Sequence, residues 1–460
     1  MITEWNKPHS ASFRDKSGHI FQSNGEFYRY IAPGFLPEFD KLGKSGLFDE
    51  LVDEGLLLSH ALLEETPDNG RILKPQQLDF MSYPYEWCFG QLQAAARVTL
   101  NVQRRALAVN MTLKDASAFN VPIHRGRPTL IDLLSLETWN EGEPWVAYRQ
   151  FCEHFLAPLA LVASHGQDAG RLWKTHVDGI PLPLASRLLP WKTRLSPGLA
   201  AHVHAHAAQQ ARAGSVPASA RAPKISKNGL LGIIDHLDAT VAGLKPPQPK
   251  TAWSHYYEET NYEREAMDAK VALVGRYLDA VTPAPKTVWD FGANDGRFSR
   301  LASERGAFTL ALDIDPEAVE RAWGEVKGRG ETRLLPLVMD LADPSAARGW
   351  AGQERESLLQ RGPADVGLAL ALVHHLAIGH NVPLEKIAEF FARACKTLIV
   401  EFVPRGDSQV KRMLATRKDI FDDYHQSGFE RAFEPHFERL GRESIPGTQR
   451  TLYLLRRRDG

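Results

Sequence analysis

From Lys286 onward, short and almost entirely apolar runs alternate with longer amphipathic stretches, and this alternation constrains the fold more than any other feature. The runs cover residues 287–291, 308–315, 333–340, 364–372, 396–403 and 451–458. Strands that are apolar at consecutive positions are buried on both faces, and helices between them are typical of parallel crossovers. The sequence therefore predicts an α/β fold in the C-terminal half, with a doubly wound, Rossmann-like sheet.

A glycine-containing turn joins the first of these strands to the helix that follows it. In the sequence DFGANDGRFS, which begins at Asp290, Gly292 and Gly296 allow a tight turn and a close backbone approach to a ligand. Asp313 ends the second strand, 23 residues after Asp290, where a carboxylate can accept hydrogen bonds from both hydroxyls of a ribose. Asp340 ends the third strand, and we expect it on the adenine side of the same pocket.

This turn resembles the cofactor motif of class I S-adenosylmethionine-dependent methyltransferases, acid-x-Gly-x-Gly-x-Gly. Asn294 replaces the middle glycine, and asparagine tolerates the left-handed backbone. The resemblance extends from about Trp253 to Arg457 and implies a transferase of the EC 2.1.1 class with S-adenosylmethionine as its cofactor. The residues that it implies in cofactor binding are Asp290, Gly292, Asn294, Gly296, Asp313 and Asp340. A nicotinamide-binding or ligand-free Rossmann domain is the alternative.

An aromatic segment, WSHYYEETNY from Trp253, precedes the predicted sheet. It resembles the N-terminal helix that covers the cofactor in these methyltransferases. The resemblance implies that Tyr256 or Tyr257 contacts the cofactor carboxylate or closes over the pocket, and we take Tyr257 as the cofactor-binding residue. Packing in the core is the alternative for both side chains.

Two histidines follow the fourth predicted strand, in the sequence LVHHL, and Glu401 ends the fifth. A methyltransferase aligns its acceptor and removes the acceptor's proton, so we expect His374, His375 and Glu401 to form a general base and its orienting group. A packing or capping role is the alternative for each histidine. Metal ligation by the same three residues, as in metal-dependent RNA-end methyltransferases, is a further alternative, but the Glu-x-x-Glu-His pattern of that family is missing and we expect no metal site. The Asn/Asp-Pro-Pro-aromatic motif of base and amide methylases is also missing, which argues against methylation of nucleic-acid bases.

The N-terminal half carries a second pattern of polar residues. Asp115 and Asn120 lie five residues apart, and Asp132 follows twelve residues later at the end of the apolar run TLID. This order resembles the catalytic loop and metal-binding aspartate of protein kinases and aminoglycoside-type kinases. It implies a kinase-like α+β domain that binds Mg-ATP, in which Asp115 orients the attacking hydroxyl while Asn120 and Asp132 hold magnesium.

The match to kinases has gaps. The His-Arg pair before the catalytic aspartate, the Phe-Gly pair after the metal-binding aspartate and the glycine-rich phosphate loop are all missing. Arg29 or Lys74 would have to replace the phosphate-pairing lysine. The alternative is a substrate-recognition domain in which Asp115 and Asn120 serve as turn and cap residues. This half also resembles the corresponding part of nodulation-associated and surface-glycan-cluster methyltransferases.

Composition divides the chain into an N-terminal α+β domain at 1–165, a helical or linker region at 166–249 and the methyltransferase domain at 250–460. The stretch from His202 to Gly229 is rich in Ala, Ser, Pro and Gly, which is typical of a loop or flexible connection. His202, His204 and His206 have the spacing of a metal site, but no acid or cysteine completes it. We therefore expect a solvated helix there.

Charge and cysteine content bound the function further. The 55 Lys and Arg residues nearly balance 56 Asp and Glu residues, so a generally basic nucleic-acid binder is excluded and nucleic acid is not an expected partner. Three cysteines far apart in the sequence argue against a disulfide framework, and the first residues lack an apolar signal segment. The longest apolar stretch, Val366–Ile378, is too short for a membrane span. We therefore expect a cytoplasmic protein without membrane insertion.

The sequence predicts a methyltransferase that acts on a polar small molecule or a glycan-type acceptor, which the N-terminal half recognises. A bifunctional kinase–methyltransferase with an ATP-dependent N-terminal domain is the alternative. A non-catalytic scaffold that binds the cofactor as a structural ligand is a second alternative.

Overall fold

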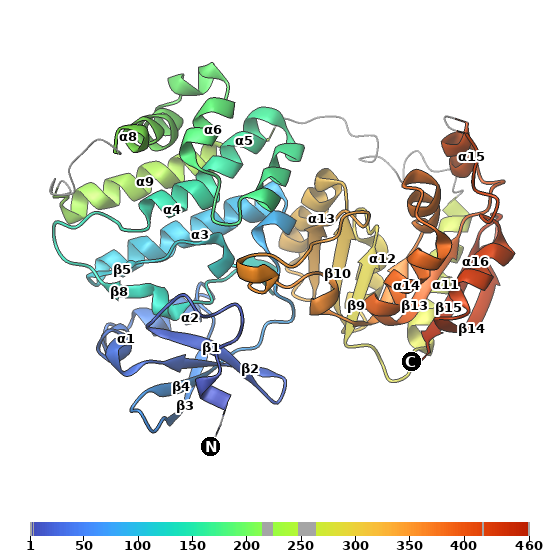
Figure 1. Cartoon of the computed structure of the whole chain (residues 1–460), viewed down its shortest axis with the longest axis horizontal. Coiled ribbons are helices and arrows are strands. Elements are labelled where there is room, and N and C mark those ends of the chain that lie inside the picture. Colours follow the sequence, from blue (N-terminus) through green and yellow to red (C-terminus); the bar gives the residue numbers. More distant parts are fainter. Residues whose placement is uncertain (1, 3, 214–223, 247–263, 416–417, 459–460) are drawn as a thin grey trace. The chain divides into compact units, whose positions relative to one another are not determined.

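The structure is a computed structural model that describes residues 2, 4–213, 224–246, 264–415 and 418–458 (Figure 1). The chain forms two compact units. Unit 1 comprises Met1–Pro249 together with the short segment Arg348–Arg355, and unit 2 comprises Lys250–Ala347 and Glu356–Gly460. The expected linker region 166–249 therefore falls within unit 1. No helix among the described residues is long and apolar enough to cross a membrane.

Unit 1 begins with a four-stranded antiparallel sheet in the order β1-β2-β4-β3. The strands are β1 (Gly18–Ser23), β2 (Glu26–Ile31), β3 (His60–Glu65) and β4 (Arg71–Pro75). Asn24 and Gly25 both have positive φ, as a two-residue hairpin turn requires, and they join β1 to β2. Phe21, Tyr28 and Ile72 are buried together on this sheet. Short helical elements accompany it: η1 (Glu4–Asn6), η2 (Pro33–Phe35), α1 (Leu36–Lys44), α2 (Leu47–Asp53) and η3 (Pro84–Glu86).

A 20-residue helix, α3 (Phe89–Ala108), leads to the polar segment of unit 1. The elements that follow are β5 (Met111–Leu113), η4 (Ala118–Asn120), β6 (Ile123–His124), β7 (Arg127–Pro128), η5 (Leu133–Ser135) and β8 (Leu136–Thr138). β6 pairs with β7 in a hairpin that turns at Arg125 and Gly126, both with positive φ. β5 pairs with β8, so the segments on either side of the hairpin are held together.

The rest of unit 1 is helical. Its elements are α4 (Tyr148–Phe151), η6 (Cys152–Leu156), α5 (Ala157–His165), η7 (Gln167–Thr175), α6 (Leu182–Leu188), η8 (Trp191–Leu195), α7 (Pro197–Leu199), η9 (Ala200–Ala205), α8 (His206–Ala213) and α9 (Lys227–Gly243). α9 packs along α3, where Gln93 Nε2 donates to the carbonyl of Val241 at 2.8 Å and Arg97 pairs with Asp238 at 3.0 Å.

The prediction of a loop from His202 was wrong over 202–213, which is helical. Alanine, frequent in this stretch, is the best helix former, and that propensity outweighs the lack of large apolar side chains. The prediction that its histidines are solvated was also wrong for His202 and His204, which are buried. Tyr148 Oη lies 2.7 Å from His202 Nδ1, and His236 Nδ1 lies 2.9 Å from His202 Nε2, so both ring nitrogens of His202 have hydrogen-bonding partners.

Unit 2 is built on a seven-stranded sheet in the order β11-β10-β9-β12-β13-β15-β14. The strands are β9 (Thr287–Phe291), β10 (Phe308–Asp313), β11 (Leu334–Val338), β12 (Ala364–Ala369), β13 (Cys395–Phe402), β14 (Phe437–Ser444) and β15 (Thr451–Arg457). The first five are parallel and the last two pair antiparallel. The doubly wound α/β sheet predicted from the apolar runs is confirmed.

Helices cover both faces of this sheet. They are α11 (Arg264–Ala280), α12 (Arg297–Ser303), α13 (Pro316–Arg329), η11 (Leu359–Arg361), η12 (His375–Gly379), α14 (Leu384–Ala394), α15 (Ser408–Leu414) and α16 (Gln426–Phe433), while η10 (Trp350–Gly352) belongs to unit 1. Val274 of α11 packs in one core with Val288 of β9. Phe291 of the same strand contacts Phe391 of α14, and side chains three positions apart in a strand point to opposite faces.

Candidate functional site

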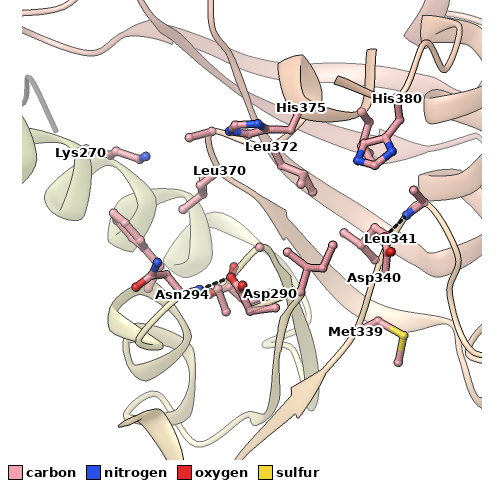
Figure 2. A pocket seen from close by; sticks show the side chains of 18 of the residues that line it. Lys270, Asp290, Asn294, Met339, Asp340, Leu341, Leu370, Leu372, His375 and His380 are labelled. Carbon is pink, nitrogen blue, oxygen red and sulfur yellow. Dashed lines mark hydrogen bonds between the residues drawn. The ribbon is translucent and has the colours of Figure 1, made fainter. Parts of the chain in front are cut away.

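The order of strands in unit 2 reverses between β9 and β12, because the chain runs outward from β9 to β11 before it returns to β12. In open α/β sheets such a switch point leaves a crevice beyond the carboxyl ends of the strands. A pocket of about 270 Å³ lies there (Figure 2). The predicted cofactor residues that line it are Asp290, Gly292, Asn294, Asp313 and Asp340. Residues from three successive strand ends thus meet at one cavity.

The turn after β9 has the backbone that its sequence requires. Gly292 has φ of 77° and Asn294 has φ of 50°, so both lie in the left-handed region. Asparagine adopts this region more readily than other residues with a Cβ atom, which explains why it can stand at the middle position of the motif. Gly296, with φ of 80°, directly precedes α12 as its N-cap. It lies next to the turn and is not among the residues that line the pocket.

Asp313, at the end of β10, ties the turn to the neighbouring strand. Its Oδ2 accepts a hydrogen bond from the Asn294 amide at 2.7 Å, and its Oδ1 accepts one from the Asp315 amide at 2.8 Å. Burial nevertheless raises the pKa of Asp313 to about 6. Its ionised form is therefore less favourable than that of an exposed aspartate, and further hydrogen-bond donors would stabilise it.

Asp290 is more deeply buried at the end of β9. Its Oδ2 accepts a hydrogen bond from the Ser299 hydroxyl at 2.6 Å, which links β9 to the first turn of α12. Burial raises the pKa of Asp290 to about 7 in spite of this bond, and the nearby charge of Asp313 adds to the shift. Asp290 and Asp313 are thus two buried carboxyl groups that line the same pocket.

Asp340 follows β11 and lines the wall opposite Lys270 in the view of Figure 2. Its Oδ1 accepts a hydrogen bond from the Ala342 amide at 2.9 Å, which fixes the loop after the strand. Met339 and Leu341 flank it and make this part of the wall apolar. A planar apolar ring with polar edges suits such a wall better than a charged group does.

Glu401 is the centre of a buried ion network that the sequence did not reveal. Its side chain is fully buried, and it pairs with Lys270 Nζ at 2.6 Å and with Arg450 Nη1 at 3.2 Å. It also accepts a hydrogen bond from the Ala371 amide at 2.9 Å, and Arg450 pairs in turn with Asp407 at 2.8 Å. The carboxylate of Glu401 is therefore held between two cations, which suits an organiser of the pocket wall better than a mobile proton acceptor.

Lys270 was missed by the sequence analysis, although it lines the pocket. It lies on α11, three residues after Met267 and four before Val274, both of which are buried. Helical periodicity therefore places Lys270 on the core-facing side of α11. A lysine at such a position could have indicated a buried charge with a function. Burial lowers the pKa of Lys270, while the neighbouring Glu401 opposes this shift.

The two adjacent histidines have different surroundings. His375, the first residue of η12, lines the pocket together with His380. His374 is completely buried, and within the described residues neither of its ring nitrogens meets a hydrogen-bonding partner. Burial lowers the pKa of His374 well below its usual value and that of His375 to about 4. Both rings are therefore neutral at pH 7, and His375 is the one that a bound molecule can reach.

Tyr256 and Tyr257, predicted to lie over the cofactor, are outside the described residues. The same holds for the other aromatic residues of that segment.

Unit 1 brings its predicted polar residues together with Arg29. Arg29 Nη1 pairs with Asp132 Oδ1 at 2.7 Å, and both side chains are largely buried. Asp115 takes part in side-chain hydrogen bonds with Asn120 and Gln150. Burial raises the pKa of Asp115, and the nearby charge of Asp132 contributes to the increase. Asp115, Asn120, Asp132 and Arg29 thus form one cluster, although Arg29 lies on β2 and the others follow β5.

The surroundings of this cluster distinguish the two cations considered for it. Lys74 pairs with Glu26 at 2.8 Å on the surface, so Arg29 is the cation that contacts Asp132. Asp115 Oδ1 also accepts a hydrogen bond from the Ser117 amide at 2.8 Å, as a turn-forming aspartate does. Across the part of the chain that the structure describes, no three His, Cys, Asp or Glu side chains are arranged to hold a metal ion.

No family model matches the sequence. The chain is 33% identical over 462 residues to the nodulation protein NoeA of Rhizobium meliloti (strain 1021). That alignment covers 98% of this chain and 96% of the other protein. The similarity therefore includes both units.

Solved structures resemble a smaller part of the chain. The N-methyltransferase NodS from Bradyrhizobium japonicum WM9 is 11% identical with a TM-score of 0.32, over 43% of this chain and 99% of that one. The magnesium protoporphyrin IX methyltransferase ChlM from Synechocystis PCC 6803, solved with bound SAH, is 17% identical with a TM-score of 0.33, over 45% and 92%. The bifunctional kinase-methyltransferase WbdD is 14% identical with a TM-score of 0.30, over 41% and 39%.

Proposed function

The chain belongs to the family of the nodulation protein NoeA, and we propose that it is an S-adenosylmethionine-dependent methyltransferase that acts on a polar small molecule or a glycan. The observation that carries this proposal is the pocket at the switch point of unit 2. Asp290, Asp313 and Asp340, each at or just beyond the end of a different strand, line one cavity together with the turn at Asn294. We further propose that unit 1 recognises the acceptor, and that the protein works in the cytoplasm.

The chemistry of the pocket fits this cofactor. Asp313 accepts one backbone N–H on each oxygen, and an ionised carboxylate has about four acceptor positions, so capacity remains for two ribose hydroxyls. The apolar wall at Met339 and Leu341 suits an adenine ring. S-adenosylmethionine supplies a methyl group that is already activated by a positively charged sulfur.

The protein's own residues then have three tasks. The turn at Gly292 and Asn294, with its left-handed backbone, lets the main chain lie close to the ligand. His375, neutral at pH 7, accepts the proton of the acceptor as the methyl group is transferred. Glu401 is a positioning residue, because it fixes Lys270 and the Ala371 amide at the pocket wall. A catalytic role of His374 stays a prediction, and its burial makes it the weaker candidate.

Calorimetric titration with S-adenosylhomocysteine tests the cofactor assignment, with NADH titrated in parallel as the probe for a nicotinamide site. We expect S-adenosylhomocysteine to bind, and Asp313→Asn to weaken its binding about 10- to 100-fold, since hydrogen bonds to a charged group are lost. The control is Asp279→Asn, an exposed carboxylate of the same unit that pairs with Arg305 outside the pocket. Equal affinity in the wild type and Asp313→Asn, or binding of NADH alone, would refute the assignment.

Transfer of a labelled methyl group to a panel of neutral sugars, oligosaccharides and small polar alcohols tests the acceptor. Incorporation into one of them supports the proposal. Cofactor binding without transfer to any polar acceptor supports the scaffold alternative instead.

The cluster in unit 1 favours a second candidate function, phosphoryl transfer from Mg-ATP to an acceptor hydroxyl. In that reaction the acceptor oxygen forms a bond to the γ-phosphorus, the bond to the β-phosphate oxygen breaks, and Asp115 takes the hydroxyl proton. Asn120 and Asp132 would hold the magnesium ion. Asp132 already accepts bonds from Arg29 on Oδ1 and from the Ser135 hydroxyl on Oδ2, so metal binding requires replacement or sharing of one of these bonds.

A thermal-shift titration with Mg-ATP separates this candidate from a recognition domain. A shift in the wild type that is lost in Asp132→Ala supports phosphoryl transfer. The absence of any shift leaves unit 1 as the acceptor-recognition unit.

A further inference from the structure

Unit 1 exposes three large apolar side chains at the end of α6 and along η8. Trp191 is 75% exposed, Leu195 is 73% exposed and Leu188 is 42% exposed, and all three lie within eight residues. Arg187, Lys192 and Arg194, between and beside them, are exposed as well. We call these six residues the Trp191 patch. Large apolar side chains gathered on a surface mark a site of interaction, since leaving them in water is unfavourable.

The backbone under the patch is fixed from within. Thr193, the buried residue between the exposed ones, donates its hydroxyl to the Pro190 carbonyl at 2.6 Å and lies 2.8 Å from His204 Nε2. The other ring nitrogen of His204 lies 2.8 Å from the Ser186 hydroxyl on α6. One buried histidine therefore joins both sides of the chain segment that carries the patch. A surface held in this way loses little conformational freedom when it docks.

The segment of the sequence that carries the patch has charge of one sign. Residues 179–234 contain seven Lys and Arg residues and no Asp or Glu, although the whole chain has a net charge of −1. Three of these cations belong to the patch. The partner that complements it therefore combines an anionic surface with an apolar interior. Single-stranded nucleic acid offers base faces to aromatic rings, whereas a bilayer with anionic lipids offers both the charge and an interior that takes up aliphatic side chains such as Leu188 and Leu195.

We propose that the Trp191 patch docks the protein on the surface of a bilayer that contains anionic phospholipid. Trp191, Leu188 and Leu195 enter the boundary between headgroups and acyl chains, where tryptophan is favoured because its ring is amphipathic. Arg187, Lys192 and Arg194 pair with lipid phosphates while their aliphatic stems cover apolar surface. The protein lies on the membrane in this arrangement and does not cross it.

The test is co-sedimentation of the full chain with two kinds of vesicle, one of phosphatidylcholine alone and one of phosphatidylcholine mixed equally with phosphatidylglycerol. We expect binding to the mixed vesicles at least roughly tenfold tighter than to the neutral ones, and weaker binding as salt increases. The double variant Trp191→Ala/Leu195→Ala should lose binding to both kinds. The double variant Lys192→Glu/Arg194→Glu should lose the preference for the anionic lipid.

The chain offers a matched control in Trp350, which is 72% exposed in η10, away from the patch residues in sequence. Trp350→Ala should bind vesicles as the wild type does. All the substituted side chains are exposed, so the melting temperature and far-ultraviolet spectrum should stay unchanged and exclude unfolding as the cause of a loss. Absence of binding to either vesicle, equal loss in Trp350→Ala, or binding to a single-stranded RNA oligomer but not to vesicles would overturn the proposal.

Discussion

The buried carboxylates of the two units differ in their hydrogen-bonding and ionic partners. In unit 2, Asp290 and Asp313 line a cavity and accept bonds from a hydroxyl and from backbone amides, and burial raises the pKa of each to about 7 and about 6. In unit 1, Asp132 is paired with the guanidinium of Arg29. Asp290 and Asp313 are less stable as anions than exposed aspartates, and a ligand that brings further donors would stabilise them, whereas Asp132 already has a cation as its partner. A set of acids that is incomplete without a ligand is the stronger sign of a binding site.

Within unit 2, Asp290 and Asp313 line the pocket, whereas Glu401 does not line it and instead pairs with Lys270 and Arg450. Glu401→Ala leaves Lys270 and Arg450 buried without their shared partner. We expect a loss of about 3–5 kcal/mol in the free energy of unfolding of unit 2, measured by urea denaturation, because removal of one partner strands buried charge. Glu443→Ala is the control, since it breaks an exposed pair with Arg276 and should change stability by less than about 1 kcal/mol.

Variants of the two adjacent histidines distinguish a catalytic side chain in the pocket from one that only packs in the core. His375→Ala should lower kcat by about 100-fold through loss of the base, with the affinity for S-adenosylhomocysteine unchanged. His374→Leu should leave kcat within about threefold of the wild type, since its nitrogens meet no partner in the described structure and a similar volume is kept. The reverse result, with kcat sensitive to His374 alone, would transfer the base to that residue.

Removal of Arg29 tests how much the ion pair with Asp132 stabilises unit 1. Arg29→Ala leaves the Asp132 carboxylate with the Ser135 hydroxyl as its bonded neighbour. We expect a loss of about 2 kcal/mol in the stability of unit 1, smaller than at Glu401 because Asp132 keeps some contact with water. Lys74→Ala, which breaks the exposed pair with Glu26, should change the unfolding midpoint little. If Mg-ATP binds better once Arg29 is gone, the pair acts as a competitor of the metal.

The smallest effect is that of pH on the empty and the filled pocket. The pKa values of Asp290 and Asp313 lie above the ordinary value of an aspartate, so their contribution to stability is complete below about pH 4 and is lost as the pH rises through 6 and 7. A ligand that donates hydrogen bonds favours the ionised form. Its affinity should therefore rise between pH 5 and 7, by about tenfold in all, because a carboxyl with a pKa of about 6 goes from mostly protonated to mostly ionised over this range. Calorimetry across this range, with Asp313→Asn as the variant that flattens the curve, measures it.

The sheet of unit 2 could be predicted because its central strands are buried on both faces and therefore apolar throughout. β14 could not be predicted in this way. It lies at the edge of the sheet, and from Glu438 to Ser444 most of its side chains are exposed, so its sequence FERLGRES carries no apolar run. The burial of His202 and His204 escaped prediction, because composition indicates solvation only where no tertiary partner covers a polar side chain.

In the candidate site, too, residues placed by local sequence rules could be predicted and long-range contacts could not. The residues at Asp290, Asn294 and Asp313 follow from local rules, since each stands at a strand end or in a turn whose spacing is fixed. The partners of Glu401 do not, because Lys270 lies 131 residues away in the chain and Arg450 lies 49 residues away. Glu401 was predicted to be part of a base, and only its long-range neighbours reveal that it is held by ions. The contact of Arg29 with Asp132 spans 103 residues and was open from the sequence for the same reason.

The network at Glu401 also bears on how unit 2 opens. It connects α11, the end of β12 and the segment before β15 through one side chain, and Asp407 extends it to the start of α15. Segments that share such a centre lose it together. The amide hydrogens of α11 and of Ala371 should therefore exchange with solvent in a single cooperative event, and not as separate frayed ends.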